Sequence, residues 1–165
     1  MAGQNRSGKM IFTALTIIWM LVIFLFSAKN ADESTEQSLA VGMRVGSIIH
    51  ADFETWSDTA KVEFAQIIDK PIRKMAHMAE YAVLGALLMW TVVSWRKSSR
   101  KSWLIAWLLA VVYACTDEVH QLFVPGRYGS VIDVGIDSVG AFIGVLVGSV
   151  VWNFIVGKNK KPGKY

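Results

Sequence analysis

The stretch "YACTDEVHQLFVPGR", Tyr113 to Arg127, ends a long apolar run with a group of charged and polar side chains. The apolar residues before it, together with this stretch, are numerous enough to cross a bilayer, which takes roughly 20 residues. Charged side chains at membrane depth are costly and commonly mark functional sites. The rest of the chain must therefore supply partners for these charges.

Apolar segments dominate the whole chain of 165 residues, of which 53% are hydrophobic, with a mean hydropathy of +0.40. This is more apolar than an ordinary soluble domain. We expect an all-α polytopic membrane protein in which residues 1–165 form a single domain. Its transmembrane helices are predicted at about residues 9–29, 76–95, 102–124 and 131–156.

The first apolar segment, Lys9 to Lys29, follows a basic flank, as a secretory signal peptide also does. Its apolar run is longer than the usual 7–15 residues of a signal, and no A-x-A-like cleavage site follows it. The pattern favours a retained helix. The single cysteine, Cys115, excludes an intrachain disulfide and a CxxC metal site.

Basic residues predict the orientation, because Lys and Arg concentrate on cytoplasmic flanks. The two chain ends and "RKSSRK" at 96–101 are basic and free of acidic residues, and four helices place all three on one side. Both termini are therefore expected in the cytoplasm. The net charge of +4 is then explained by the basic cytoplasmic flanks of the membrane helices. It implies no nucleic-acid partner, because the basic tails are short and lack interleaved aromatic residues.

The long outer connection, about residues 33–70, has apolar residues at roughly helical spacing in two stretches. We expect two amphipathic helices on the outer membrane surface or folded over the bundle. Ser34 with Gln37 fits a capping box for the first, and Ser57 or Asp58 could cap the second. Pro71 is expected to limit the extension of the second helix.

Alternating helix directions bring the unusual polar groups to the same depth, near the outer leaflet. His77 and Glu80 share a helix face, as do Asp117, His120 and Gln121, because residues three and four apart are neighbours on a helix. Gly140, Gly144 and Gly148 follow the small-xxx-small spacing that allows close helix approach. The sequence therefore predicts a polar site above a tightly packed final helix.

The residue types suggest particular roles. Histidine titrates near neutral pH and carboxylates can orient it, whereas arginine binds phosphate through two parallel hydrogen bonds. Hard divalent cations prefer carboxylate oxygens. We therefore expect catalytic roles for His77, Glu80, Asp117 and His120, substrate binding by Arg73, Lys74, Tyr81, Gln121 and Arg127, and a candidate Mg²⁺ or Ca²⁺ site at Glu118, Asp133 and Asp137.

Simpler interpretations exist for several of these residues. Arg73 and Lys74 at a helix end could be interfacial anchors. Asp133 could be a charge favoured by the helix macrodipole. The tryptophans at 19, 90, 95, 103 and 152 are expected to be membrane-facing or belt aromatics. The joint set of two histidines, several carboxylates and Arg127 favours a functional site, because a structural ion-pair cluster needs fewer groups.

Three motifs resemble the VanZ-like family: "RKMAHMAEYAVLGALL", "YACTDEVHQLFVPGR" and "YGSVIDVGIDSVGAFIG". The resemblance covers about residues 24–148, with Asp137 where that family often has asparagine. It implies a small four-helix protein of the bacterial plasma membrane, in a family with members linked to teicoplanin resistance. A remote similarity of VanZ-like proteins to lipid head-group enzymes, such as phosphatidylserine synthases, has been proposed; fold-level analogy alone does not establish function.

Three functions remain open on the sequence. The first is an enzyme that hydrolyses or exchanges phosphate head groups of lipids or lipid-linked precursors at the outer leaflet. The second is a non-catalytic protein that binds a lipid, an envelope precursor or a lipophilic glycopeptide. The third is a proton-coupled transporter, which the apolar inner halves of the last three helices disfavour. The lipid, the reaction, any cofactor and the oligomeric state are not specified.

Overall fold

The computed structural model describes residues 6–96 and 101–158. Within these ranges it contains only helices, in the order α1 (Arg6–Ser27), α2 (Ala31–Ile49), the short 3-10 helix η1 (Phe53–Thr55), α3 (Asp58–Trp95), α4 (Ser102–Gln121) and α5 (Val131–Lys158). The all-α prediction is confirmed. The predicted orientation depends on the two chain ends and on the 96–101 loop. Most of these residues lie outside the described ranges.

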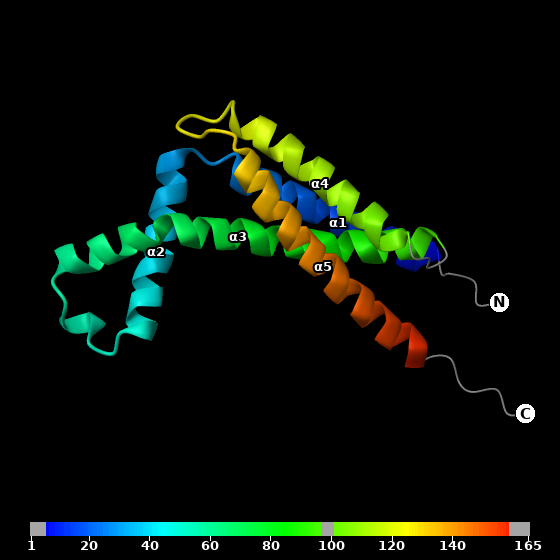
Figure 1. Cartoon of the computed structure of the whole chain (residues 1–165), viewed down its shortest axis with the longest axis horizontal. Coiled ribbons are helices and arrows are strands. Elements are labelled where there is room, and N and C mark those ends of the chain that lie inside the picture. Colours follow the sequence, from blue (N-terminus) through cyan, green and yellow to red (C-terminus); the bar gives the residue numbers. More distant parts are fainter. Residues whose placement is uncertain (1–5, 97–100, 159–165) are drawn as a thin grey trace, which may run out of the picture.

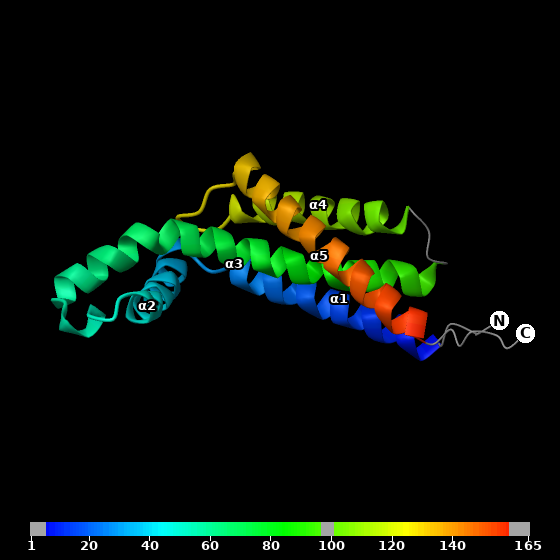
Figure 2. The same cartoon turned by 60° about the horizontal axis from the view of Figure 1, so that its bottom comes forward.

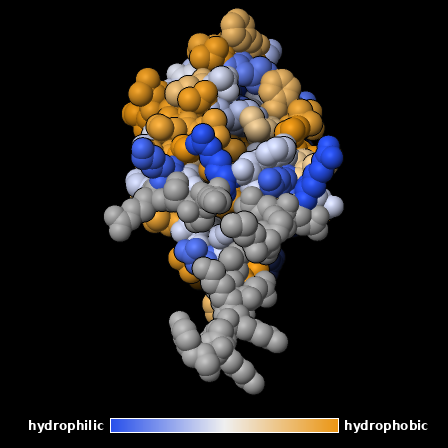
Figure 3. Space-filling view, turned by 90° about the vertical axis from the view of Figure 1, so that its right-hand side faces the viewer, coloured by the Kyte–Doolittle hydropathy of each residue, from blue (hydrophilic) through white to orange (hydrophobic). Residues whose placement is uncertain are grey.

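Four of these helices, α1, α3, α4 and α5, are long and apolar enough to cross a membrane. They lie alongside one another as a bundle, and α2 stands apart at one end with the first part of α3 (Figures 1 and 2). Apolar side chains cover much of the surface seen from the other end, where α1 begins and α5 ends (Figure 3). The chain is therefore a multi-pass membrane protein.

Helix α3 differs from its predicted bounds, because it runs from Asp58 to Trp95 as one helix of 38 residues that contains Pro71. A helix of this length extends over about 57 Å, whereas the hydrocarbon layer is about 30 Å thick. The first third of α3 therefore projects from the bundle and packs against α2. The expectation that Pro71 limits the helix was wrong; a proline removes one backbone bond and can bend a helix that its neighbours hold in place.

Polar caps define the starts of α2 and α3. Asn30 caps α2, and its Oδ1 accepts a hydrogen bond of 2.9 Å from the amide of Glu33. The predicted cap at Ser34 is wrong, because Ser34 already lies in the first turn and donates its amide to the carbonyl of Asn30. Ser57 caps α3 through the amide of Ala60, as the sequence predicted.

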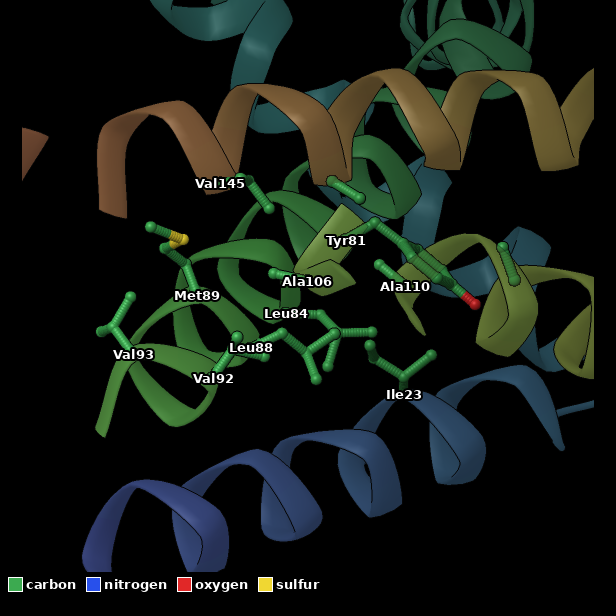
Figure 4. Packing of buried hydrophobic residues seen from close by; sticks show 12 residues of the cluster. Ile23, Tyr81, Leu84, Leu88, Met89, Val92, Val93, Ala106, Ala110 and Val145 are labelled. Atoms are coloured by element: carbon green, nitrogen blue, oxygen red, sulfur yellow. The ribbon is translucent and has the colours of Figure 1, made fainter. Parts of the chain in front are cut away.

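The apolar core lies between α3 and its three neighbours (Figure 4). Tyr81, Leu84 and Val93 of α3 are almost completely buried, with Ile23 of α1 and Val145 of α5 against them. Helix α4 contributes small residues, Ala106, Ala110 and Ala114, all with no exposed surface. Such small side chains let helix backbones approach closely in a membrane.

The closest approach is between α3 and α5, where the predicted glycine face packs directly on backbone. A Cβ atom at Gly140 would collide with the carbonyl oxygen of Met78, and one at Gly144 with that of Ala82. Gly148 meets Ala86 in the same way, although less tightly. The prediction of a close helix approach along this face is confirmed.

Indole N–H groups connect the helices below the polar site. Trp90 donates to the carbonyl of Gly148, Trp107 to that of Ser138, and Trp19 to that of Glu80, each at 2.9 Å. The interpretation of Trp19 and Trp90 as membrane or belt aromatics was therefore incomplete. Their rings are half-buried and their polar edges bond to neighbouring helices.

Candidate functional site

The mouth of the bundle is formed by the end of α1, by α2, by residues 69–81 of α3, and by the end of α4, the 122–130 loop and the start of α5. Gly126 enables the loop to turn here, because its φ of 73° lies in the left-handed region that glycine tolerates. The loop folds back toward α2, where the amide of Ala31 donates to the carbonyl of Pro125 at 3.3 Å. All twelve predicted site residues come from segments that meet at this end.

The larger of two cavities, here called the main cavity, has a volume of about 490 Å³. Helix α3, the end of α4 and the start of α5 supply most of its charged groups. Its charged and imidazole-bearing residues are Lys70, Arg73, Lys74, His77, Glu118, Arg127, Asp133 and Asp137. Gln121 lines it as well. The main cavity therefore collects eight of the twelve residues singled out in the sequence.

A second cavity of about 230 Å³, here called the side cavity, lies between α2, α3 and the end of α1. Glu80 lines it together with polar residues of α2 such as Gln37 and Ser38. Arg73, His77 and Arg127 line both cavities. These three side chains therefore stand at the junction of the two spaces.

Arg127 is the cation least engaged by acidic groups at this junction. Its Nε donates to the carbonyl of Lys29 at 3.2 Å, and among the described residues no carboxylate lies within 4.0 Å of its guanidinium. Burial, and then the nearby charge of Arg73, lower the pKa of Arg127 from its ordinary value. Two guanidinium groups thus face the junction close enough to repel each other, which favours an anion between them.

Arg73 is held by a residue that the sequence analysis missed. Its Nη2 lies 2.6 Å from Oδ2 of Asp69, one turn earlier on α3. The hydroxyl of Ser38 on α2 donates to the other oxygen of Asp69, which is buried. This chain of contacts fixes the guanidinium of Arg73 on rigid elements. The i, i+4 spacing of Asp69 and Arg73 was the available signal.

The predicted metal ligands make contacts with other protein groups. Nζ of Lys74 lies 2.8 Å from Oδ1 of Asp133, and Oε2 of Glu118 accepts the amide of Ser130 at 2.7 Å. Within residues 6–96 and 101–158, no three His, Cys, Asp or Glu side chains are grouped so that they could hold a metal ion. A lysine contacts Asp133 and a backbone amide contacts Glu118, and the metal-binding role of Glu118, Asp133 and Asp137 stays a prediction.

His77 and Glu80 face each other without a hydrogen bond. The distance from Nδ1 of His77 to Oε2 of Glu80 is 3.9 Å, which is beyond hydrogen-bond range. Nδ1 of His77 is buried and has no partner among the described residues. The two side chains are therefore close neighbours on one face of α3, and the predicted role of Glu80 as the orienting partner stays a prediction.

Three predicted residues lie outside both cavities. Asp117 and Tyr81 are buried beneath the mouth, with the Asp117 carboxylate 3.4 Å from Nε2 of Gln121. His120 stacks on Phe24 of α1 with ring centroids 4.4 Å apart. The sequence analysis grouped both residues with His77, Glu80 and Arg127 in one polar site, but Asp117 and His120 line neither cavity. Helix α4 directs these two side chains toward α1 and the bundle interior, and their predicted catalytic roles stay predictions.

Asp137 forms part of the floor of the main cavity. It is 1% exposed, and both of its carboxylate oxygens lack a hydrogen-bond partner among the described residues. The carboxylates of Glu118 and Asp117 are charged neighbours of it. The main cavity therefore combines guanidinium groups with one buried carboxyl group, that of Asp137, whose oxygens have no hydrogen-bond partner among the described residues.

Comparison with known proteins gives one informative result. No curated protein and no solved structure matches the chain. The family model described as VanZ/LLP1 matches residues 12–152, a range that begins within α1, ends within α5 and includes α2, α3, α4 and the whole mouth. The chain belongs to the VanZ/LLP1 family.

Proposed function

We propose that this membrane protein is an enzyme that acts on the phosphate head group of a lipid or a lipid-linked envelope precursor. The observation that carries the proposal is the junction of the two cavities, where Arg73, Arg127 and His77 meet. A phosphodiester bound there would have one substituent in each cavity. Guanidinium groups suit this ligand, because they offer paired N–H donors in the geometry of two phosphate oxygens.

Preorganisation supports the anion site. Asp69 and Ser38 hold Arg73, while the carbonyl of Lys29 holds one edge of Arg127. Donors fixed before the substrate arrives stabilise developing charge without reorganisation in the transition state. The two arginines therefore supply binding and electrostatic stabilisation for an attack on phosphorus.

His77 is the proposed general base and acid, and Glu80 is its proposed orienting partner. In hydrolysis, the oxygen of a water molecule bonds to phosphorus while its proton passes to His77. The bond from phosphorus to the head-group oxygen breaks, and the imidazolium returns the proton to that oxygen. In head-group exchange, an alcohol replaces the water in the same sequence. Positioned acid–base groups of this kind contribute typically 10²–10⁴-fold to a rate.

A lipid profile tests this proposal. Membranes of cells that express the wild type are compared with membranes that contain His77→Ala, at matched protein levels. We expect a lipid species that changes with the wild type and not with His77→Ala. His50→Gln is the matched control, because His50 follows α2, lines neither cavity and packs against Trp56 and Phe64. Identical lipids in all three strains would reject the enzyme.

A binding protein for lipid, envelope precursor or lipophilic glycopeptide is the second candidate. The observation behind it is that Arg73 and Arg127 line the junction of the two cavities, because these groups would serve for binding alone. Unchanged lipids combined with an Arg127-dependent change in teicoplanin susceptibility would support this candidate over the enzyme.

The proposed orientation places the mouth at the outer leaflet and both termini in the cytoplasm. It rests on the basic chain ends and the basic 96–101 connection. In a Cys115→Ser background, an impermeant thiol reagent applied to intact cells should label a cysteine at Ser57 and miss one at Lys101. Labelling at Lys101 in intact cells, with Ser57 protected, would reverse the orientation.

A further inference from the structure

Positively and negatively charged side chains both line the main cavity. Arg73 and Arg127 are at its junction with the side cavity, whereas Asp137 and Glu118 line it from α5 and α4. A ligand with a single negative charge would satisfy the arginines and leave the carboxylates without a counter-charge. Charge complementarity therefore points to a ligand that carries both signs.

We propose that the main cavity selects a zwitterionic head group, a phosphodiester of an amino alcohol, whose ammonium group binds Asp137 and Glu118. This inference rests on the proposed function, because it assumes that Arg73 and Arg127 bind the phosphate of the same molecule. It names the class of substrate, which the arginines alone leave open.

Asp137 carries most of the argument. Its side chain is 1% exposed, lines the cavity, and has no partner for either carboxylate oxygen among the described residues. A buried carboxylate is normally paired or hydrogen-bonded, because burial of an unpaired charge is costly. An ammonium N–H donor from a ligand would supply the missing partner.

Further carboxyl groups lie close to Asp137. Glu118 and Asp117 are its neighbours, so an ammonium group bound there would meet several oxygen acceptors. Nζ of Lys74 forms an ion pair with Asp133 at 2.8 Å. The ammonium group of a ligand would therefore bind the carboxylates of Asp137 and Glu118. Oε1 of Glu118 has only a long contact of 3.5 Å with Gln121. A primary ammonium, with three N–H donors, suits this set of oxygen acceptors.

The test uses the full chain in detergent and two deacylated head groups, glycerophosphoethanolamine and glycerophosphoglycerol. Both are phosphodiesters, and the ammonium group replaces a neutral glycerol group. We expect isothermal titration calorimetry to show about tenfold tighter binding of glycerophosphoethanolamine than of glycerophosphoglycerol. This factor corresponds to the lower end of the range for one charge-assisted hydrogen bond. Asp137→Asn, which keeps the shape and removes the charge, should reduce this preference to about twofold or less.

Two further variants keep the test decisive. Glu118→Gln should also reduce the preference, which provides a second route if Asp137→Asn unfolds. Glu36→Gln, the same chemical change at an exposed residue of α2 outside both cavities, should preserve it. Arg127→Ala should weaken both compounds by a similar factor.

The outcomes separate the two proposals. The zwitterion proposal is overturned if the wild type binds both compounds with equal affinity. It is also overturned if the preference survives both Asp137→Asn and Glu118→Gln. Either result leaves the anion site intact. If the wild type binds neither compound, the anion site itself fails, and the present inference fails with it.

Discussion

The mouth of the bundle and its lower half differ in how their buried polar atoms are hydrogen-bonded. In the lower half, polar side chains find partners across helices: Trp90 bonds to the carbonyl of Gly148, and the hydroxyls of Thr16 and Thr91 are 2.9 Å apart. At the mouth, seven buried side-chain atoms of the described residues have no hydrogen-bond partner. They belong to Ser27, His77, Tyr81, Asp117, His120 and Asp137.

This difference suggests a test that separates stability from the proposed function within one small bundle. A polar atom in hydrocarbon stabilises the fold only when it is paired, and the lower half meets this condition with indole and hydroxyl groups. The mouth contains imidazole and carboxyl atoms without such partners among the described residues. If a bound ligand supplies the partners, the two halves should respond differently to substitution.

Arg127→Lys should give the largest effect, and it should affect ligand binding rather than folding. A lysine keeps the charge and loses the paired N–H donors. Loss of one charge-assisted bond, worth about 1.5–3 kcal/mol, predicts roughly 10- to 150-fold weaker binding of a phosphodiester head group by titration. Arg44→Lys, at an exposed position of α2 outside both cavities, is the control.

The competing explanation for Arg127 is that it only neutralises the acids at the mouth. In that case Arg127→Ala would remove the partner of buried charges and lower the free energy of unfolding by about 3–5 kcal/mol. Thermal unfolding in detergent measures this. A large loss in Arg127→Ala, together with normal binding by Arg127→Lys, would place Arg127 with the structural residues.

Gly144→Ala should give the next largest effect, and it should affect folding. The added Cβ would collide with the carbonyl oxygen of Ala82, so α3 and α5 must separate. Overpacking of this kind costs about 1–3 kcal/mol. Gly135→Ala is the matched control, because a Cβ there meets nothing within 4 Å. Equal thermal stability of the two variants would show that the glycine face is not the main helix contact.

Trp90→Phe should give the smallest effect, a modest loss of thermal stability with unchanged head-group binding. It removes the hydrogen bond to the carbonyl of Gly148 and keeps most of the ring. Interhelical hydrogen bonds in membranes are worth about 0.6 kcal/mol on average. Trp103→Phe, at an exposed ring that packs edge-on against Phe142, should change less. A loss of head-group binding in Trp90→Phe would mean that the two halves are coupled.

Local patterns in the sequence determined the membrane helices and the depth of the site. Uncharged runs of about 20 residues must form helices in lipid, because only helices satisfy their own backbone groups there. Once four such runs alternate in direction, His77, Asp117 and Asp133 must come to the same end. The glycine spacing of α5 likewise predicted a close helix contact, because a period of four residues defines one helix face.

Only the tertiary structure decided which polar groups meet. Helix rotation turns His120 toward Phe24 and Asp117 into the bundle interior, and the spacing of residues in α4 does not fix that rotation. Lys74 pairs with Asp133 from another helix, so one of the three expected metal ligands is engaged by a cation. Pro71 stays within a helix because α2 packs along the first part of α3, a contact between distant segments. Each of these outcomes depends on long-range packing, whereas the sequence pattern reports local periodicity.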